Sequence, residues 1–234
     1  MSGNAVDNAK ARAAEEAAAM VENGMRLGLG SGSTALLFVD ALAARVEAGL
    51  SLPPAVATST ATAERAARHG IAIAEMMGRD GPPALDLAVD GADEIDPSLR
   101  LIKGGGASLL REKIVAQMAR HMVVIADASK QVDRLGRFPL PVEVVRFGWS
   151  ATAARVTDAV GVAPALRMVN GVALVTDNGN HILDCPLGTI GDPDEVAAAL
   201  LAIPGVVEHG LFLSEADEAI LAGADGLERL TATP

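Results

Sequence analysis

Short apolar segments alternate with longer helical segments along the first half of the chain. The apolar segments predict strands at Met25–Leu29, Ala55–Ala57, Ile71–Ala74, Leu85–Val89 and Met122–Ala126. The segments around them, several bounded by Ser, Thr or Gly, predict helices at Asn8–Val21, Thr34–Ala48, Ala61–His69 and Ala107–Ala119. Strands that alternate with helices form a parallel sheet with helices on both faces. The sequence therefore predicts an α/β fold built on a mostly parallel sheet.

The pattern changes after Phe138-Pro139-Leu140-Pro141, whose two prolines are typical of a linker. The order becomes strand, helix, two strands, helix and strand, which is typical of a ferredoxin-like α+β domain. These elements are expected at Val142–Val145, Ala151–Val160, Leu166–Val175, His181–Asp184, Asp194–Ala202 and Val206–Phe212. Asp177-Asn178-Gly179 predicts a hairpin with a type I′ turn. We expect two domains, a larger one from residues 1–137 with 213–234 and a smaller one from residues 138–212.

Composition and charge exclude several classes of protein. With 50% apolar and 21% charged residues, the chain resembles a packed globular protein. A net charge of −11 disfavours binding to nucleic acid or to anionic lipid, and no apolar run approaches the ~20 residues that span a bilayer. The single cysteine, Cys185, is expected to be a small buried residue, and the first ten residues do not resemble a secretory signal. We therefore expect a cytoplasmic protein that binds neither nucleic acid nor a membrane.

The glycine-rich segment Gly28-Leu29-Gly30-Ser31-Gly32-Ser33-Thr34 lies where a predicted strand meets a helix. Backbone amides, hydroxyl groups and the helix dipole can bind an anion at such a turn. Ser33 stands where a dinucleotide-binding fingerprint needs glycine, and the Gly-Lys of a P-loop is missing. The segment therefore favours a small anion over NAD or ATP, and an ordinary strand-to-helix turn is the alternative.

Asp90-Gly91-Ala92-Asp93-Glu94-Ile95-Asp96 places four acids directly after a predicted strand. The carboxyl edge of a parallel sheet is the usual position of an α/β active site. Neighbouring carboxylates suit proton transfer or metal binding, although the order of residues does not match a calcium loop. The alternative is an acidic surface turn in which Asp96 caps the chain before Pro97.

Three successive glycines stand out in the segment from Lys103-Gly104-Gly105-Gly106 to Arg111-Glu112-Lys113. Glycine is costly in conformational entropy, so three in a row indicate close approach of a ligand to the backbone. Lys103 supplies a cation, and Glu112 lies on the following helix between two basic residues. A base beside an electrophile favours enolisation, whereas a simple helix-starting turn is the alternative.

Together these segments resemble ribose-5-phosphate isomerase of the A type. The resemblance includes the segments above, and it extends through Ala126–Val132, Phe138–Val144, Val175–Asn180 and Ile203–Val207. It implies an aldose-ketose isomerase of the pentose phosphate pathway that needs no cofactor or metal. It also implies a homodimer or homotetramer. The acidic balance of the smaller domain disfavours phosphate, so we expect that domain to serve packing or subunit contact and the larger domain to be the catalytic one.

The resemblance implies a substrate site, and Glu112 matches the family's catalytic base. The positions that match the substrate-binding motifs are Ser31, Gly32, Ser33, Thr34, Asp90, Gly91, Ala92, Asp93, Lys103, Gly104, Gly105, Gly106 and Lys130. One carboxylate can move a proton between C2 and C1 through an enediolate, while Lys103 and the glycine-loop amides stabilise the oxyanion. Asp90 or Asp93 is expected to open the sugar ring.

Some assignments stay open at this point. The phosphate is expected at the loop of residues 31–34, at Lys130, or at both. Another sugar-phosphate enzyme, such as an amino-sugar phosphate deaminase or a lactonase, would share the anion-binding loop. A sensor that binds a sugar phosphate without turnover would share it too.

Overall fold

The computed structural model describes residues 3–74, 84–224 and 226–231 and divides the chain into two compact units. The first unit comprises Met1–Ala92, Arg111–Lys130 and Ser214–Pro234, and the second comprises Asp93–Leu110 and Gln131–Leu213. The second unit thus extends beyond the expected domain of residues 138–212, because it includes the segments 93–110 and 131–137. The chain crosses between the units after Ala92 and after Leu110, inside two of the motifs that the sequence singled out.

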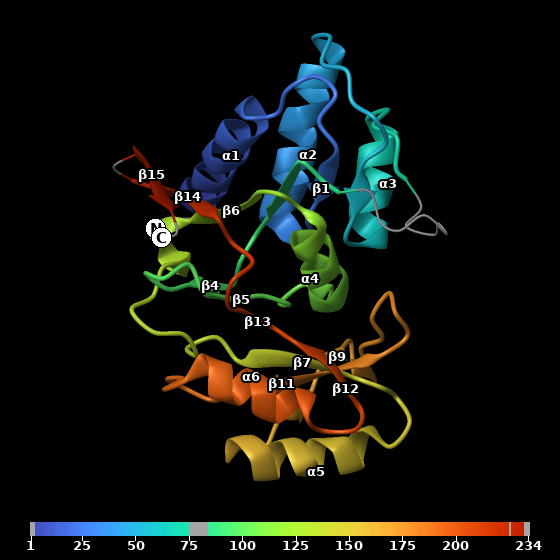
Figure 1. Ribbon diagram of the computed structural model, residues 1–234, viewed down its shortest axis with the longest axis vertical. Helices are drawn as coiled ribbons and strands as arrows, with labels where there is room; N and C mark the ends of the chain where they lie inside the picture. The colour runs from blue at the N-terminus through green and yellow to red at the C-terminus, as the bar shows by residue number, and fades with distance from the viewer. Residues whose placement is uncertain (1–2, 75–83, 225, 232–234) are drawn as a thin grey trace. The chain divides into compact units, whose positions relative to one another are not determined.

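The first unit is built on a six-stranded sheet of order β15-β14-β6-β3-β1-β2 (Figure 1). Its strands are β1 (Leu27–Leu29), β2 (Val56–Ala57), β3 (Leu87–Asp90), β6 (Met122–Asp127), β14 (Glu218–Gly223) and β15 (Gly226–Thr231). All neighbouring strands are parallel except β14 and β15, which form an antiparallel hairpin. Every residue of β1, β3 and β6 is buried, as expected of a parallel sheet covered on both faces. The predicted α/β fold is confirmed.

Helices α1 (Gly3–Ala19), α2 (Gly32–Glu47) and α3 (Thr60–Arg68) pack in sequence order, α1 beside α2 and α2 beside α3 (Figure 1). Alanines at helical spacing, among them Ala9, Ala13 and Ala17, form the buried face of α1. They share a core with Phe38 of α2 and with Ile125 of β6. Helix α4 (Leu109–Met118) follows the triple glycine.

One strand expected from the sequence is reduced to a single bridge. Ile71–Ala74 forms no strand; only Ile73 pairs, in parallel, with Ala55. Leu85, expected to begin the next strand, likewise makes one bridge to Ala119, and the strand itself runs from Leu87 to Asp90. Ile71 and Leu85 are buried although neither lies in a strand, so an apolar run does not determine strand length.

The second unit contains the predicted ferredoxin-like arrangement. The elements follow as β7 (Leu140–Val144), α5 (Trp149–Val160), β8 (Ala165–Leu166), β11 (His181–Cys185), α6 (Pro193–Leu201) and β12 (Val206–His209). The four strands form an antiparallel sheet of order β12-β7-β11-β8. Two additions complete the unit. They are a ribbon of β9 (Met168–Val169) with β10 (Val172–Ala173), and a three-stranded sheet of β4 (Glu94–Ile95), β5 (Leu101–Ile102) and β13 (Leu211–Phe212).

The turn at Asp177-Asn178-Gly179 differs from the predicted type I′. The predicted type I′ turn needs a positive φ at both Asn178 and Gly179, whereas here only Gly179 has one, +80°. The amide of Gly179 donates to the carbonyl of Thr176, so Asp177 and Asn178 are the central residues of the turn that forms. The hydroxyl of Thr176 accepts hydrogen bonds from the amides of Asn178 and Asn180 and donates to Glu143. The side chains of Asn178 and Asn180 donate to the same Glu143 oxygen. The motif therefore serves a buried carboxylate as well as the turn.

No helix in the described part of the chain is both long and apolar enough to cross a membrane. Cys185 is fully buried, as expected. Burial, together with the nearby Asp184 carboxylate, raises the pKa of the Cys185 thiol to about 12. This cysteine therefore belongs to the core of the second unit.

Candidate active site

The loop between β1 and α2 is held by contacts within the first unit. Gly30 must lack a side chain, because a Cβ there would lie 2.2 Å from the carboxylate carbon of Asp90. The carbonyl oxygen of Gly30 accepts a hydrogen bond of 2.9 Å from the hydroxyl of Thr62. Gly32 has a φ of +82°, a conformation that favours glycine. The loop therefore enters α2 in one defined conformation, with the amides of the first helical turn at its end.

Asp90, at the end of β3, fastens this loop to the sheet edge. Its Oδ1 accepts hydrogen bonds from the amides of Ser31, at 3.0 Å, and Gly91, at 2.7 Å. The residue is only 3% exposed. The same Asp90 lines a narrow pocket in this unit with Gly28, Thr58 and Glu112.

Glu112 lies in the first turn of α4 and is 5% exposed. The hydroxyl of Ser31 donates a short hydrogen bond to its Oε1. Ser31 is the N-cap residue of α2, yet its side chain makes no capping hydrogen bond. The structure thus directs the Ser31 hydroxyl to the predicted base, and the N-terminal end of α4 favours the negative charge on Glu112.

Lys10 is a contributor that the sequence did not single out for the site. Its Nζ lies 3.4 Å from the hydroxyl of Ser33, although the two residues are 23 positions apart. The chain has only four lysines, and this scarcity is the sequence signal that could have indicated Lys10. Its ammonium group places positive charge beside the loop of residues 31–34.

In the second unit, Lys103 directly follows β5 and Asp93 directly precedes β4. Lys103 is 2% exposed, its amide donates to the carbonyl of Gly210 at 2.8 Å, and its Nζ lies 5.4 Å from the ring centroid of Phe212. Asp93 accepts a hydrogen bond of 2.7 Å from the amide of Gly105. Gly104 has a φ of +102°. The triple glycine, the lysine and one aspartate are therefore brought together within this unit.

The other two acids of the acidic segment, Glu94 and Asp96, accept hydrogen bonds from backbone amides. Glu94 is fully buried and accepts hydrogen bonds of 2.7 Å from the amides of Gly136 and Phe138. Asp96 accepts from the amides of Ser98 and Arg100 and forms an ion pair with the Arg100 side chain. Asp96 therefore caps its own turn, but it is buried, so the segment is not the acidic surface turn that the alternative expected. Glu94 binds a loop that is distant in the sequence. Among the described residues, no group of three or more His, Cys, Asp or Glu side chains is arranged to hold a metal ion.

The remaining predicted residues belong to the first unit. Thr34 is in the first turn of α2, and a Cβ on Gly91 would lie 3.9 Å from it. Ala92 ends the first unit, and Lys130 ends a short 3-10 helix, Ala128–Lys130, after β6. No hydrogen bond or ion pair between Lys130 and the other predicted site residues occurs in the part of the chain that the structure describes.

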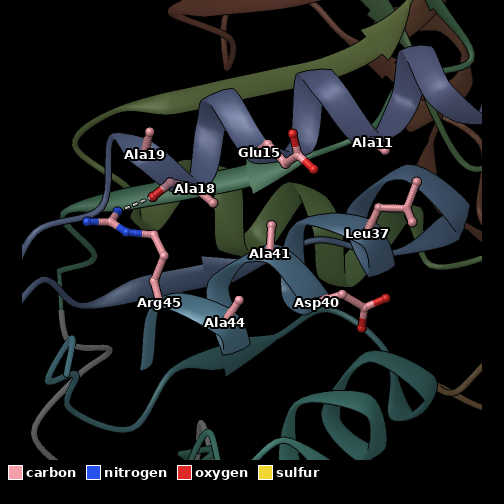
Figure 2. Close-up of a pocket in the computed structure, with 9 residues that line it drawn as sticks. All are labelled: Ala11, Glu15, Ala18, Ala19, Leu37, Asp40, Ala41, Ala44 and Arg45. Carbon is pink, nitrogen blue, oxygen red and sulfur yellow. Dashed lines mark hydrogen bonds between the residues drawn. The ribbon is translucent and has the colours of Figure 1, made fainter. Parts of the chain in front are cut away.

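A larger open pocket of about 590 Å³ lies between α1 and α2, away from the predicted residues (Figure 2). Its lining is mostly alanine and also includes Leu37, Glu15, Asp40 and Arg45. The guanidinium group of Arg45 donates to the carbonyl of Ala18 in the last turn of α1 (Figure 2) and to that of Val21, just after the helix. Arg45 therefore caps α1, because the last carbonyls of a helix have no partner within it.

Residues 54–226 match the model of the family described as ribose 5-phosphate isomerase A, or phosphoriboisomerase A. The chain belongs to this family. Ribose-5-phosphate isomerase A of Methylorubrum extorquens is 55% identical over 223 residues, which cover 93% of each chain. The enzyme of the same name from Caulobacter vibrioides is 51% identical over 228 residues, or 96% of this chain and 98% of the relative.

Solved structures of the family share the fold of the whole chain. A D-ribose-5-phosphate isomerase in complex with phospho-erythronic acid superposes with a TM-score of 0.90 at 38% identity, over 97% of this chain and 99% of that one. Ribose 5-phosphate isomerase from Plasmodium falciparum gives a TM-score of 0.92 at 30% identity, over 97% and 100%. The resemblance to the isomerase family is therefore confirmed, and the family interconverts ribose 5-phosphate and ribulose 5-phosphate in the pentose phosphate pathway.

Proposed function

We propose that this chain interconverts D-ribose 5-phosphate and D-ribulose 5-phosphate through an enediolate, with Glu112 as the base. Membership of the isomerase family is the observation that carries this proposal. The burial of Glu112 and its hydrogen bond from Ser31 support the assignment of the base, because they fix one carboxylate in a defined orientation. A buried, oriented carboxylate loses little entropy when it meets the substrate.

The proposed reaction moves one proton between neighbouring carbons. In the direction from aldose to ketose, Glu112 removes the proton from C2, and the C2–H electron pair forms the C1–C2 double bond of the enediolate. The protonated Glu112 then returns the proton to C1, while a proton moves from the C2 hydroxyl to the former carbonyl oxygen. The carbonyl group thus passes from C1 to C2 with no change in the overall number of atoms or electrons.

Negative charge on the enediolate oxygens needs fixed donors. We assign this role to Lys103 and to the amides of Gly104, Gly105 and Gly106. The burial of Lys103 supports the assignment, because a cation is more effective where water is excluded. The exposure of Gly105 and Gly106 supports it too, because a ligand can approach their backbone.

Ring opening is assigned to the aspartates of the same segment. Asp93 is half-buried and Asp90 is buried, so Asp93 is the more accessible to a sugar hydroxyl. The test compares Asp90→Asn with Asp93→Asn on the natural, mostly cyclic substrate. The variant of the ring-opening residue should show a slow step that vanishes when the open-chain aldehyde is supplied transiently.

The phosphate is assigned to the loop of residues 31–34 at the start of α2. Helix N-termini favour anions, and Lys10 adds a cation beside Ser33. Lys130 remains a predicted second cation for the same group. The Lys10→Met variant should bind the substrate more weakly, with a higher KM and little change in kcat. The reason is that a phosphate far from C1 and C2 is held equally in the ground state and in the transition state.

The wider setting of the enzyme is also part of the proposal. We expect a cytoplasmic homodimer or homotetramer, with catalysis in residues 1–137 and 213–234. The net charge of −11 supports the absence of nucleic-acid and anionic-membrane partners. Exposed apolar side chains in the second unit, such as Phe147, Val169 and Val172, support a role for residues 138–212 in subunit contact.

A panel of sugar phosphates tests the proposed function. The purified chain should interconvert ribose 5-phosphate and ribulose 5-phosphate and leave amino-sugar phosphates and phosphogluconolactone unchanged. Turnover of one of those compounds without isomerisation would identify a different sugar-phosphate enzyme. Binding of ribose 5-phosphate with no turnover would identify a sensor.

A further inference from the structure

Arg167 connects the ferredoxin-like sheet of the second unit to the triple-glycine loop. Its Nε and Nη2 donate to the two carboxylate oxygens of Asp184 on β11. Its Nη1 donates to the carbonyl of Gly104, at 2.7 Å, and to the carbonyl of Gly105, at 3.0 Å. One guanidinium group therefore links an ion pair to two successive peptide groups of the loop.

The guanidinium group has little freedom to move. Its side chain is 14% exposed, and the carboxylate of Asp184 forms a bidentate ion pair with its Nε and Nη2. The Arg167 backbone is also held, because its amide donates to Ile182 and its carbonyl accepts from Leu174, both at 2.9 Å. Nη1 is thus presented to the loop from a fixed position.

The loop itself is a β-turn whose central peptide could adopt two orientations, because both central residues are glycine. The amide of Ala107 donates to the carbonyl of Gly104 at 3.0 Å, so Gly105 and Gly106 are the two central residues. Turns of types I and II differ by a rotation of the peptide between the central residues, and glycine tolerates both. A type II turn needs a positive φ at the position of Gly106, whereas a type I turn needs a negative one. Gly106 has no positive φ, so the turn is of type I. Because Arg167 binds the Gly105 carbonyl, it holds the central peptide in this orientation.

The same contacts set the direction of two amides. In a trans peptide the N–H points away from the C=O, and the described chain has no cis peptide bonds. The hydrogen bond from Arg167 to the Gly105 carbonyl therefore turns the Gly106 amide to the opposite side. The peptide group between Gly104 and Gly105 takes part in two hydrogen bonds. Its carbonyl oxygen accepts from Arg167 and its N–H donates to Asp93, so each hydrogen bond strengthens the other.

We propose that Arg167 is a positioning residue of the isomerase, which acts through the Gly104–Gly106 backbone to orient the oxyanion-binding amides and Asp93. The inference rests on the proposed function, because it gives these groups their roles. Arg167 itself holds two carbonyl oxygens and Asp184 and needs no contact with the substrate. Asp184 is the anchor that keeps Arg167 in place.

The test compares Arg167→Met with a matched variant, Arg100→Met. Arg100 also pairs with an aspartate in the second unit, but its side chain bonds to Asp96 and not to the glycine loop. Arg167→Lys and Asp184→Asn are made as well, so that the role can be judged even if Arg167→Met does not fold. Measurements are kcat and KM for ribose 5-phosphate, the Kd of phospho-erythronic acid, whose planar carboxylate resembles the enediolate, and the melting temperature.

We expect Arg167→Met to lower kcat by roughly 10- to 100-fold, with KM changed less than about threefold, as misplacement of catalytic groups predicts. Phospho-erythronic acid should bind more weakly by a similar factor. Arg167→Lys and Asp184→Asn should lie between this variant and the parent, because each keeps part of the contact. Arg100→Met should keep the parent kcat, whatever its melting temperature.

Equal kcat values in the Arg167 and Arg100 variants, with the parent protein active, would overturn the positioning role and leave the proposed function standing. So would a rise in KM alone. A parent protein that does not isomerise ribose 5-phosphate would instead refute the proposed function. If Arg167→Met fails to fold, parent-like kcat in both Arg167→Lys and Asp184→Asn would overturn the inference.

Discussion

Replacing Gly106 with alanine separates what the glycine turn needs for folding from what it offers a ligand. Gly104 has a φ of +102°, so this position requires glycine for the fold, and a Cβ on Gly105 would lie 2.6 Å from Oδ1 of Asp93 and displace that carboxylate. Gly106 is exposed, has no positive φ, and an added Cβ would meet no atom of the described residues within 4 Å. The fold therefore tolerates alanine at position 106.

The expected effect on stability is small and favourable. Alanine restricts the unfolded chain more than glycine does, which stabilises a compatible site by about 0.4–1 kcal/mol. For a chain of this size the melting temperature should rise by roughly 1–4 °C. The expected effect on catalysis is large and unfavourable, because the methyl group occupies the open face by which an enediolate oxygen would reach the Gly106 amide. Loss of one such donor lowers kcat by roughly 10²–10³-fold.

The assay measures kcat for ribose 5-phosphate and the melting temperature on the same preparation. Gly191→Ala is the matched control, since Gly191 is also exposed, has no positive φ and has no described neighbour within 4 Å of an added Cβ. The control should gain stability and keep its activity. Full activity in the Gly106→Ala variant would refute the proposal that the substrate approaches the Gly106 amide. A marked loss of stability would refute the conclusion that the turn accommodates a Cβ at this position.

Three further predictions concern the base, metal ions and the cysteine. Glu112→Gln should lower kcat by several orders of magnitude with a modest change in KM, because the amide cannot accept the C2 proton; steady-state kinetics check this, and a small effect would reassign the base. Activity should persist after exhaustive chelation, since carboxylate and lysine suffice for the proposed steps; recovery only on adding Mg²⁺ or Mn²⁺ would contradict it. With its pKa raised to about 12, Cys185 should remain a thiol at pH 8 and react with iodoacetamide only after unfolding, as mass spectrometry of native and denatured samples would show. Rapid labelling of the native protein would contradict the observed burial.

The fold was largely predictable because the periodicity of apolar residues reports burial directly. Segments such as Met122–Ala126 are apolar throughout since both faces of their sheet are covered, and the structure buries all of β6. Pairing is harder to predict, because it depends on a partner elsewhere in the chain. Ile71–Ala74 has the composition of a strand but forms one bridge, through Ile73.

The residue types of the candidate site were also visible in the sequence, but their partners were not. Glu94 and Asp93 are adjacent acids, and no local pattern separates them. Glu94 binds the amides of Gly136 and Phe138, more than 40 positions away, whereas Asp93 binds the amide of Gly105. Every residue except proline carries an amide donor, so such partners leave no signature in side-chain patterns.

Buried carboxylates show how the contacts of an acid indicate its role. Glu143 and Glu94 are fully buried, and donors from their own unit bind them: hydroxyl and amide side chains for Glu143, backbone amides for Glu94. Such contacts offset the cost of burying a charge and stabilise loops. Glu112 also accepts a hydrogen bond from its own unit, but the donor is the hydroxyl of Ser31, in the loop that we propose for the phosphate. If the Ser31 hydroxyl orients the base, the Ser31→Ala substitution should lower kcat more than it raises KM. A larger effect on KM than on kcat would instead indicate that Ser31 binds the phosphate.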